Sequence, residues 1–143
     1  MILFSSALEL ALKIIMNILI IDAAKNKVFL TLMVDRIIYT CSHENSKINF
    51  EKLIILINDF LKKNNNSLDK IRTIYVNGGP GSFAGIRNSI STVKAIFLTK
   101  KIDYYCFSVK DFTESKDVEY QDVPSLCEKY KVKKNLINPI YLE

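Results

Sequence analysis

The sequence predicts an α/β fold in which helices cover the faces of a mixed five-stranded sheet. Apolar runs of strand length alternate with segments of helical periodicity in the order βββαβαβ, which is typical of layered α/β domains. The chain has 143 residues, a length that suits one domain. Its content of 49% hydrophobic residues is high enough for a buried core and excludes a disordered or fibrous chain.

The first three strands are expected to form an antiparallel meander. Residues 17–22 are a continuous apolar run that ends in Asp22, which is typical of a buried central strand. Residues 28–34 and 37–42 are rich in β-branched and aromatic side chains and are separated by two residues, a hairpin spacing. The fourth and fifth strands are predicted at 71–77 and 102–109.

Both predicted helices have an unusual distribution of side chains. In the first, over residues 49–63 with Asn49 as N-cap, the apolar side chains fill an arc of ~160°, whereas one contact with a sheet needs only ~100°. The second follows the glycine-rich turn and runs to about residue 100. One side of it carries a seam of Phe83, Ile86, Ile90, Val93 and Phe97, and the other carries small residues, namely Ala84, Gly85, Ser89, Thr92 and Ala95. We therefore expect these helices to pack against another polypeptide as well as the sheet.

Composition excludes several classes of protein. Three cysteines (Cys41, Cys106 and Cys127) and one histidine (His43) make neither a disulfide scaffold nor a CxxC zinc ribbon, and the odd count suits a reducing cytoplasm. Buried thiols are expected rather than a metal site. The formal net charge of +5 permits contact with RNA or with an acidic partner without establishing either.

Residues 1–15 are expected to be an N-terminal extension, either an appended helix or the product of an upstream start codon. They lack the basic start of a signal peptide, and Glu9 and Lys13 interrupt the apolar run that a membrane span needs. No membrane association is expected.

The turn between the fourth strand and the second helix has two possible interpretations. Its spacing, Gly79, Gly81 and Gly85, misses the dinucleotide fingerprint by one residue and lacks the Lys-Ser/Thr of a P-loop. It is therefore a structural turn or an anion site at a helix start. Asp22 is interpreted as a cap of a turn, with a phosphate or metal role as the alternative. For Arg87 the interpretations are binding of phosphate, pairing with a partner carboxylate, and a solvated or intrachain salt bridge.

Residues 79–87, Gly-Pro-Gly-Ser-Phe-Ala-Gly-Ile-Arg, closely resemble the GPGSFTGVR signature of the TsaB (YeaZ) family of bacterial tRNA modification. The resemblance covers roughly residues 16–109, and residues 139–142 resemble the closing P-x-Y-L of the family. It implies an actin-like (ASKHA, ribonuclease H-like) N-terminal lobe over 16–109, followed by a tail at 110–143 in place of a second lobe.

The resemblance also implies a cytoplasmic, non-catalytic subunit that binds and activates a TsaD-type transferase in N6-threonylcarbamoyladenosine modification of tRNA. A TsaE-type ATPase joins the cycle, tRNA is reached through the complex, and the complex uses ATP although this subunit has no cofactor of its own. The motif residues are Gly79, Pro80, Gly81, Ser82, Phe83, Gly85 and Arg87. The expected partner interface is Leu53, Leu56, Ile57, Phe60, Phe83, Ile86, Arg87, Ile90 and Val93.

Three departures from the family pattern qualify this expectation. The first strand ends in Asp22-Ala23-Ala24, without the usual hydroxyls, and Asn49 stands where the family often has histidine. Without a second lobe a two-lobed nucleotide cleft does not form in one chain, so independent ATP binding is not expected. The alternative functions are a phosphate-binding protein that uses the glycine-rich turn and a degenerate remnant that forms homodimers through the same helices.

Overall fold

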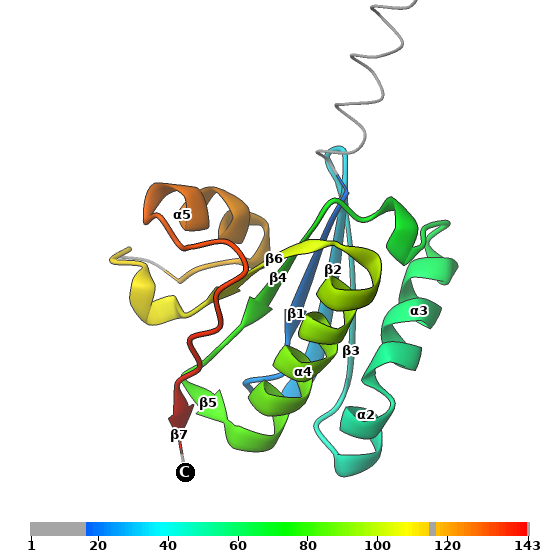
Figure 1. Cartoon of the computed structure of the whole chain (residues 1–143), viewed down its shortest axis with the longest axis horizontal. Coiled ribbons are helices and arrows are strands. Elements are labelled where there is room, and N and C mark those ends of the chain that lie inside the picture. The colour runs from blue at the N-terminus through cyan, green and yellow to red at the C-terminus, as the bar shows by residue number, and fades with distance from the viewer. Residues whose placement is uncertain (1–16, 115–116, 143) are drawn as a thin grey trace, which may run out of the picture.

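The computed structural model describes residues 17–114 and 117–142, so the extension at 1–15 lies outside the described part. Its centre is a five-stranded sheet with the strand order β3-β2-β1-β4-β6 (Figure 1). The strands are β1 (Ile18–Asp22), β2 (Lys27–Val34), β3 (Ile37–Glu44), β4 (Thr73–Asn77) and β6 (Asp103–Phe107). The predicted mixed α/β sheet is confirmed.

The N-terminal meander has the predicted pairing. β1 is antiparallel to β2 with Ile18 opposite Met33, and β2 is antiparallel to β3 with Val34 opposite Ile37. The turn needs no glycine because Asp35 itself adopts a positive φ of 56°, a conformation that aspartate tolerates better than most residues. β4 and β6 continue the sheet parallel to β1, so the carboxyl ends of these three strands lie at one edge.

The predicted helix over 49–63 is in fact two helices, α2 (Lys47–Glu51) and α3 (Leu53–Lys63). Ser46 is the N-cap of α2, since its Oγ accepts a hydrogen bond from the N–H of Asn49 at 3.3 Å. The prediction of Asn49 as the N-cap was therefore wrong. The N-cap is Ser46, three residues earlier, because a serine hydroxyl can also accept the capping hydrogen bond. Asn49 instead donates through Nδ2 to the carbonyl of Glu44.

Helix α4 (Phe83–Lys100) packs with α2 and α3 on one face of the sheet (Figure 1). Ser82 caps its start and Lys101, at a φ of 60°, ends it in a left-handed conformation. Leucine and isoleucine side chains of β1, β2, β4, α3 and α4 form the main core there, including Leu19, Leu30, Ile57, Leu61, Ile74 and Ile86. The predicted seam of α4, apart from the exposed Phe83, thus faces the chain's own sheet.

The chain after β6 covers the opposite face of the sheet. It forms the short helices η2 (Val109–Asp111) and η3 (Tyr120–Asp122) and then α5 (Val123–Lys129). A second, smaller core lies beneath it, made of Ile20, Tyr75, Phe107, Phe112, Val123, Leu126 and Cys127. At the C-terminal end β7 (Tyr141–Leu142) pairs in parallel with β5 (Gly81–Ser82), a pairing that the sequence did not predict.

None of the helices within 17–114 and 117–142 combines the length and the apolar character that crossing a membrane demands.

Candidate functional site

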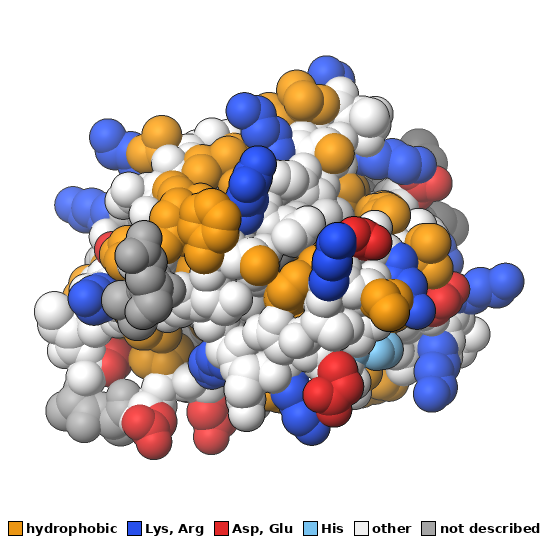
Figure 2. Space-filling view, turned by 90° about the horizontal axis from the view of Figure 1, so that it is seen from below, with side chains coloured by type: hydrophobic (Ala, Val, Ile, Leu, Met, Phe, Trp, Pro, Cys, Tyr) orange, Lys and Arg blue, Asp and Glu red, His pale blue; other side chains and the backbone are white. Residues whose placement is uncertain are grey.

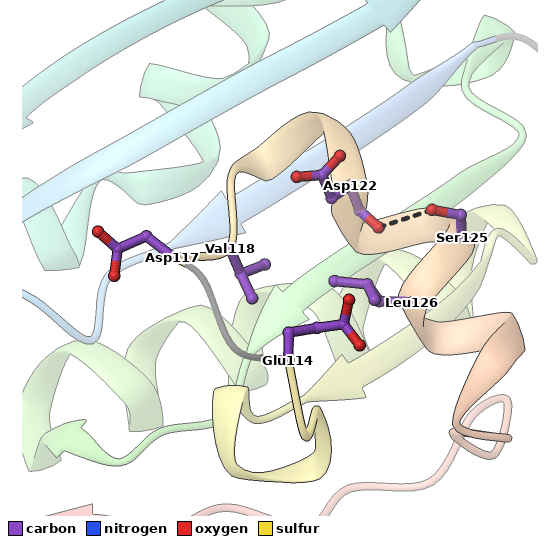
Figure 3. A pocket seen from close by; sticks show the side chains of 6 residues that line it. All are labelled: Glu114, Asp117, Val118, Asp122, Ser125 and Leu126. Carbon is purple, nitrogen blue, oxygen red and sulfur yellow. Dashed lines mark hydrogen bonds between the residues drawn. The ribbon is translucent and has the colours of Figure 1, made fainter.

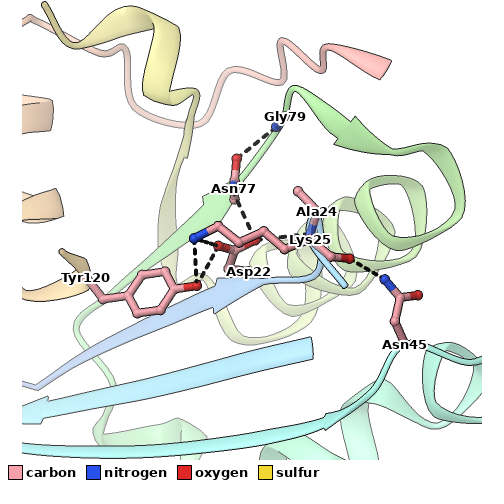
Figure 4. A network of polar contacts seen from close by, with 7 residues as sticks. All are labelled: Asp22, Ala24, Lys25, Asn45, Asn77, Gly79 and Tyr120. Atoms are coloured by element: carbon pink, nitrogen blue, oxygen red, sulfur yellow. Dashed lines mark hydrogen bonds and ion pairs between the residues drawn. The ribbon is translucent and has the colours of Figure 1, made fainter. Parts of the chain in front are cut away.

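Two polar side chains stand where β1 and β4 end side by side. Asp22 closes β1 and is only 1% exposed, and Asn77 closes β4 and is 4% exposed. The Asn77 Nδ2 donates to Asp22 Oδ1 at 3.1 Å, and the N–H of Ala24 donates to the same oxygen at 3.0 Å (Figure 4). A buried carboxylate is costly unless it is hydrogen-bonded, and here the strand ends supply the donors.

The second oxygen of Asp22 is reached from the distant tail. The hydroxyl of Tyr120 in η3 donates to Oδ2 at 2.6 Å, and Lys25 Nζ lies 3.5 Å from the same oxygen (Figure 4). Lys25 Nζ also lies 5.1 Å from the centroid of the Tyr120 ring. Burial, and then the neighbouring charge of Asp22, raise the pKa of Tyr120 well above that of an ordinary tyrosine, so its hydroxyl remains a donor.

The glycine-rich turn beside this cluster uses its own N–H groups internally. The N–H of Gly78 donates to the carbonyl of Phe107 at 2.7 Å, that of Gly79 to Asn77 Oδ1 at 2.9 Å, and that of Ser82 to the carbonyl of Ala24 at 2.9 Å. Phosphate-binding turns instead aim such groups at the ligand. These bonds favour the structural interpretation of the turn.

Two of the glycines are required by their surroundings. Gly79 has a φ of +116°, and a Cβ there would lie 1.9 Å from the carbonyl oxygen of Ile140. At Gly85 a Cβ would lie 1.8 Å from the carbonyl oxygen of Ala23. The first turn of α4 therefore rests directly on the end of β1, and the motif residues hold β1, α4 and the C-terminal tail together.

Seven residues of the expected partner interface lie in the chain's own core. Leu53, Leu56, Ile57, Phe60, Ile86, Ile90 and Val93 are all buried. The apolar arc of α3 is wide because α3 packs both on the sheet and on α4. The part of the arc that is not needed for the sheet contact packs against α4. This corrects the inference that these side chains are available to a partner, whereas Phe83 and Arg87 are exposed.

What the two helices do expose is a narrower surface. On α3, Ile54 and Ile55 face outwards. On α4 the outer face, as we call it, consists of the exposed residues Ala84, Arg87, Ser91, Lys94, Ala95 and Leu98. Of the small residues expected on this side, Gly85 and Ser89 are instead buried.

The start of α4 lies at the end of the molecule that also holds β5 and β7. The Phe83 ring meets the Tyr141 ring of β7 edge-on, with 4.7 Å between the centroids, and the Arg87 guanidinium lies 5.8 Å from the Phe83 ring. Figure 2 looks at this end and shows apolar side chains interspersed with Lys and Arg. The tail thus contacts the start of α4, and no described residue of the chain covers the outer face.

The remaining candidates for chemistry are less promising. Cys41 Sγ lies 3.8 Å from His43 Nε2 on β3, whereas Cys106 is in the core, and no group of three metal-ligating side chains comes together within the described residues. A pocket of about 150 Å³ on the tail is lined by Glu114, Asp117, Val118, Asp122, Ser125 and Leu126 (Figure 3). Its three carboxylates disfavour anions, and the Ser125 hydroxyl is already donated to the carbonyl of Asp122.

Sequence reasoning found Asp22 and the motif turn but missed the two side chains that donate hydrogen bonds to the Asp22 carboxylate. Asn77 had a usable signal, since it is a polar residue at the end of a buried strand parallel to β1. Tyr120 had none, because it is 98 residues away from Asp22 in a polar stretch.

The sequence and the fold were compared with those of known proteins. No family model matches the chain. A curated relative, the tRNA threonylcarbamoyladenosine biosynthesis protein TsaB of Buchnera aphidicola subsp. Baizongia pistaciae (strain Bp), is 37% identical over 65 residues, which cover 39% of this chain and 29% of the relative.

Two solved structures from Pseudomonas aeruginosa share the fold, namely YeaZ and a protein described as similar to peptidase YeaZ. For each the TM-score is 0.59 at 18% identity, over 64% of this chain and 43% of the other. The chain therefore spans less than half the length of the relatives that it matches. A partial sequence match and a shared α/β fold together confirm the resemblance of this chain to the TsaB (YeaZ) family.

Proposed function

We propose that this chain takes part in threonylcarbamoyladenosine modification of tRNA, as a non-catalytic subunit that binds and activates a TsaD-type transferase. The observation that carries the proposal is the sequence match to a TsaB protein, whose name assigns it to this biosynthesis. The motif at residues 79–87 adds support, because a Cβ added at any of its three glycines, Gly79, Gly81 and Gly85, would lie within 2.2 Å of a backbone oxygen.

The outer face of α4 is the surface that suits a protein partner. Alanine and serine at positions 84, 91 and 95 allow a second helix to approach closely, since the distance between packed helices depends on the side chains at the contact. Arg87 and Lys94 give the face a positive charge, and α4 contains no acidic residue. We infer that the partner offers a helix with small or acidic side chains, in place of the wider apolar interface expected from the sequence.

The cluster at Asp22 supports a non-catalytic role. Both carboxylate oxygens accept hydrogen bonds from this chain's own groups, and so does Asn77 Oδ1. A phosphate or a metal ion would have to displace these partners. In this proposal ATP is used by the complex, which includes a TsaE-type ATPase, and this chain contacts tRNA only as part of the complex.

Reconstitution tests the proposal. The chain is mixed with the cognate TsaD-type protein, the TsaE-type ATPase, tRNA and the precursors, and the modified adenosine is measured by mass spectrometry. We expect modification to depend on this chain, and we expect no saturable heat when ATP is titrated into the chain alone. Modification that is equal with and without the chain would refute the proposal, and self-association without binding to the TsaD-type protein would favour the homodimer alternative.

A further inference from the structure

The two edges of the sheet differ in how the chain covers them. β6 forms one edge and β3 forms the other (Figure 1). Along β6 the tail pairs with the strand, because the N–H of Tyr104 donates to Asn135 Oδ1 at 2.9 Å and the N–H of Asn135 donates to the carbonyl of Tyr104 at 2.8 Å. Asn135 Nδ2 also donates to Asp103 Oδ1 at 2.9 Å. The chain therefore provides hydrogen-bond partners for this edge itself.

The edge at β3 has no such cover from the described residues and none of the usual protection. An edge strand is normally kept from pairing with another chain by a bulge, a lysine or a proline. β3 pairs one to one with β2 over eight residues, so it has no bulge, and it contains neither lysine nor proline. Ile37 and Ile38 at its start are 56% and 40% exposed. These features favour the addition of a further strand at this edge.

The hairpin between β2 and β3 determines which backbone groups of β3 are available. The two residues that flank a two-residue loop exchange hydrogen bonds, so Ile37 directs its N–H and carbonyl towards β2. Successive residues of a strand alternate, so the backbone groups of Ile38, Thr40 and Ser42 point away from β2. The next carbonyl in this series, that of Glu44, accepts from Asn49 Nδ2 at 2.7 Å, which agrees with this alternation.

We propose that β3 is a self-association edge, on which β3 of a second copy of this chain adds antiparallel with the two-fold axis at Thr40. In this register Thr40 lies opposite Thr40 of the second copy, and Ile38 lies opposite Ser42. All three residues direct their backbone groups outwards, so the N–H and carbonyl groups of the two strands can pair in both directions. The two five-stranded sheets then form one continuous sheet.

The charges at the two ends of β3 select this register and a second copy as the occupant. Arg36, in the turn before β3, comes beside Glu44 of the second copy, and the symmetry produces this pair twice. Both side chains are exposed, and neither has an ion pair with a described residue of its own chain. Opposite charges across paired strands are favourable. An axis shifted to Cys41 places Glu44 opposite Ile38 and loses both pairs.

This proposal does not rest on the proposed partner role, because β3 shares no residue with the outer face of α4. The contact is one strand wide, which places it among small and transient interfaces. We therefore expect a reversible dimer with a dissociation constant on the order of 10–100 µM.

Sedimentation velocity of the whole chain, from about 5 to 500 µM, tests the dimer. Thr40→Pro removes the outward N–H at the axis, and with it both hydrogen bonds there. Proline is tolerated in an edge strand when the missing donor faces solvent, so the variant should fold, which circular dichroism checks. We expect it to weaken the dimer at least about tenfold. Thr40→Val is the matched control, because it keeps the N–H and should dimerise as wild type does.

Two charge reversals test the register without touching the backbone. Arg36→Glu and Glu44→Arg should each weaken self-association about fivefold or more, because each places like charges at both ends of the dimer. An equal mixture of the two variants pairs opposite charges at both ends again. The mixture should therefore dimerise as wild type does.

Three results would overturn the proposal. The first is a wild-type chain that remains monomeric at about 500 µM, where a dimer of the expected affinity would predominate. The second is a dimer that folded Thr40→Pro leaves intact, since the interface would then lie elsewhere, as in a dimer formed through the helices. The third is a mixture of the two charge variants that associates no better than either variant alone.

Discussion

Substitution of Gly85 by alanine tests the close approach of α4 to the end of β1. The added Cβ would lie 1.8 Å from the carbonyl oxygen of Ala23, and contacts of Cβ atoms below 3.0 Å essentially do not occur. The helix must therefore move by at least 3.0 minus 1.8, or 1.2 Å. Such a shift strains the packing of Ile86 and Ile90, which are buried next to it.

The expected magnitude is a balance of two effects. Overpacking costs ~1–3 kcal/mol, and a clash with a backbone carbonyl belongs to the upper end of this range, ~2–3 kcal/mol, whereas alanine in a helix is better than glycine by ~1 kcal/mol. We expect Gly85→Ala to lower the free energy of unfolding by about 1–2 kcal/mol, equivalent to a decrease in Tm of about 3–8 °C. Urea unfolding followed by circular dichroism measures it.

Ser91→Ala is the matched control, because Ser91 is exposed on the same helix and the change should stay within about 0.5 kcal/mol of wild type. A Gly85→Ala variant as stable as the wild type would show that helix propensity outweighs the clash, and that α4 does not rest on β1 as described.

Three further predictions concern the thiols and the tail. Burial raises the pKa of the Cys127 thiol to about 12 from 9.0, so the unfolded chain loses this proton first and the free energy of unfolding falls as the pH rises above 9. In urea titrations from about pH 8 to 10.5, the free energy of unfolding should therefore decline more steeply in wild type than in Cys127→Ala, by up to ~1.4 kcal/mol per pH unit. Equal slopes for the two proteins would contradict this. Cys41, which is half-buried, should react with a thiol reagent well before buried Cys106, and simultaneous labelling in the folded protein would be inconsistent with the structure. Tyr141→Ala removes the edge-on ring contact with Phe83 and should cost less than about 1.5 kcal/mol in thermal unfolding, because both rings are partly exposed; a larger loss would mean that the tail carries more of the fold than its contacts indicate.

Periodicity and strand length predicted the sheet well because its signals are local. The apolar run that ends at Asp22 and the pair of β-rich runs around Asp35 are sufficient to predict β1, β2 and β3 and their antiparallel pairing. The break between α2 and α3 at Lys52 has no comparable signal, because Phe50 and Leu53 both fit one continuous apolar stripe and both are buried.

The interface prediction failed for a physical reason. An apolar arc wider than one sheet contact shows only that a helix has two apolar neighbours, and the arc does not say whether the second belongs to the same chain. In α3 the second neighbour is α4, so Leu56 and Phe60 are internal. The contact of Tyr120 with Asp22 and the pairing of β7 with β5 depend on where the tail returns, which no local pattern encodes.

The proposed partner surface is the outer face of α4, and one binding measurement tests both this surface and the partner role most directly. The cognate TsaD-type protein is titrated with the wild-type chain, with Ser91→Arg, and with Ser42→Arg, which places the same change on exposed β3. We predict saturable binding that Ser91→Arg weakens at least about tenfold, a loss of ~1.4 kcal/mol, while Ser42→Arg binds as wild type does. Equal affinity for all three chains would contradict the assignment of the outer face, and the absence of binding by the wild-type chain would contradict the partner role itself.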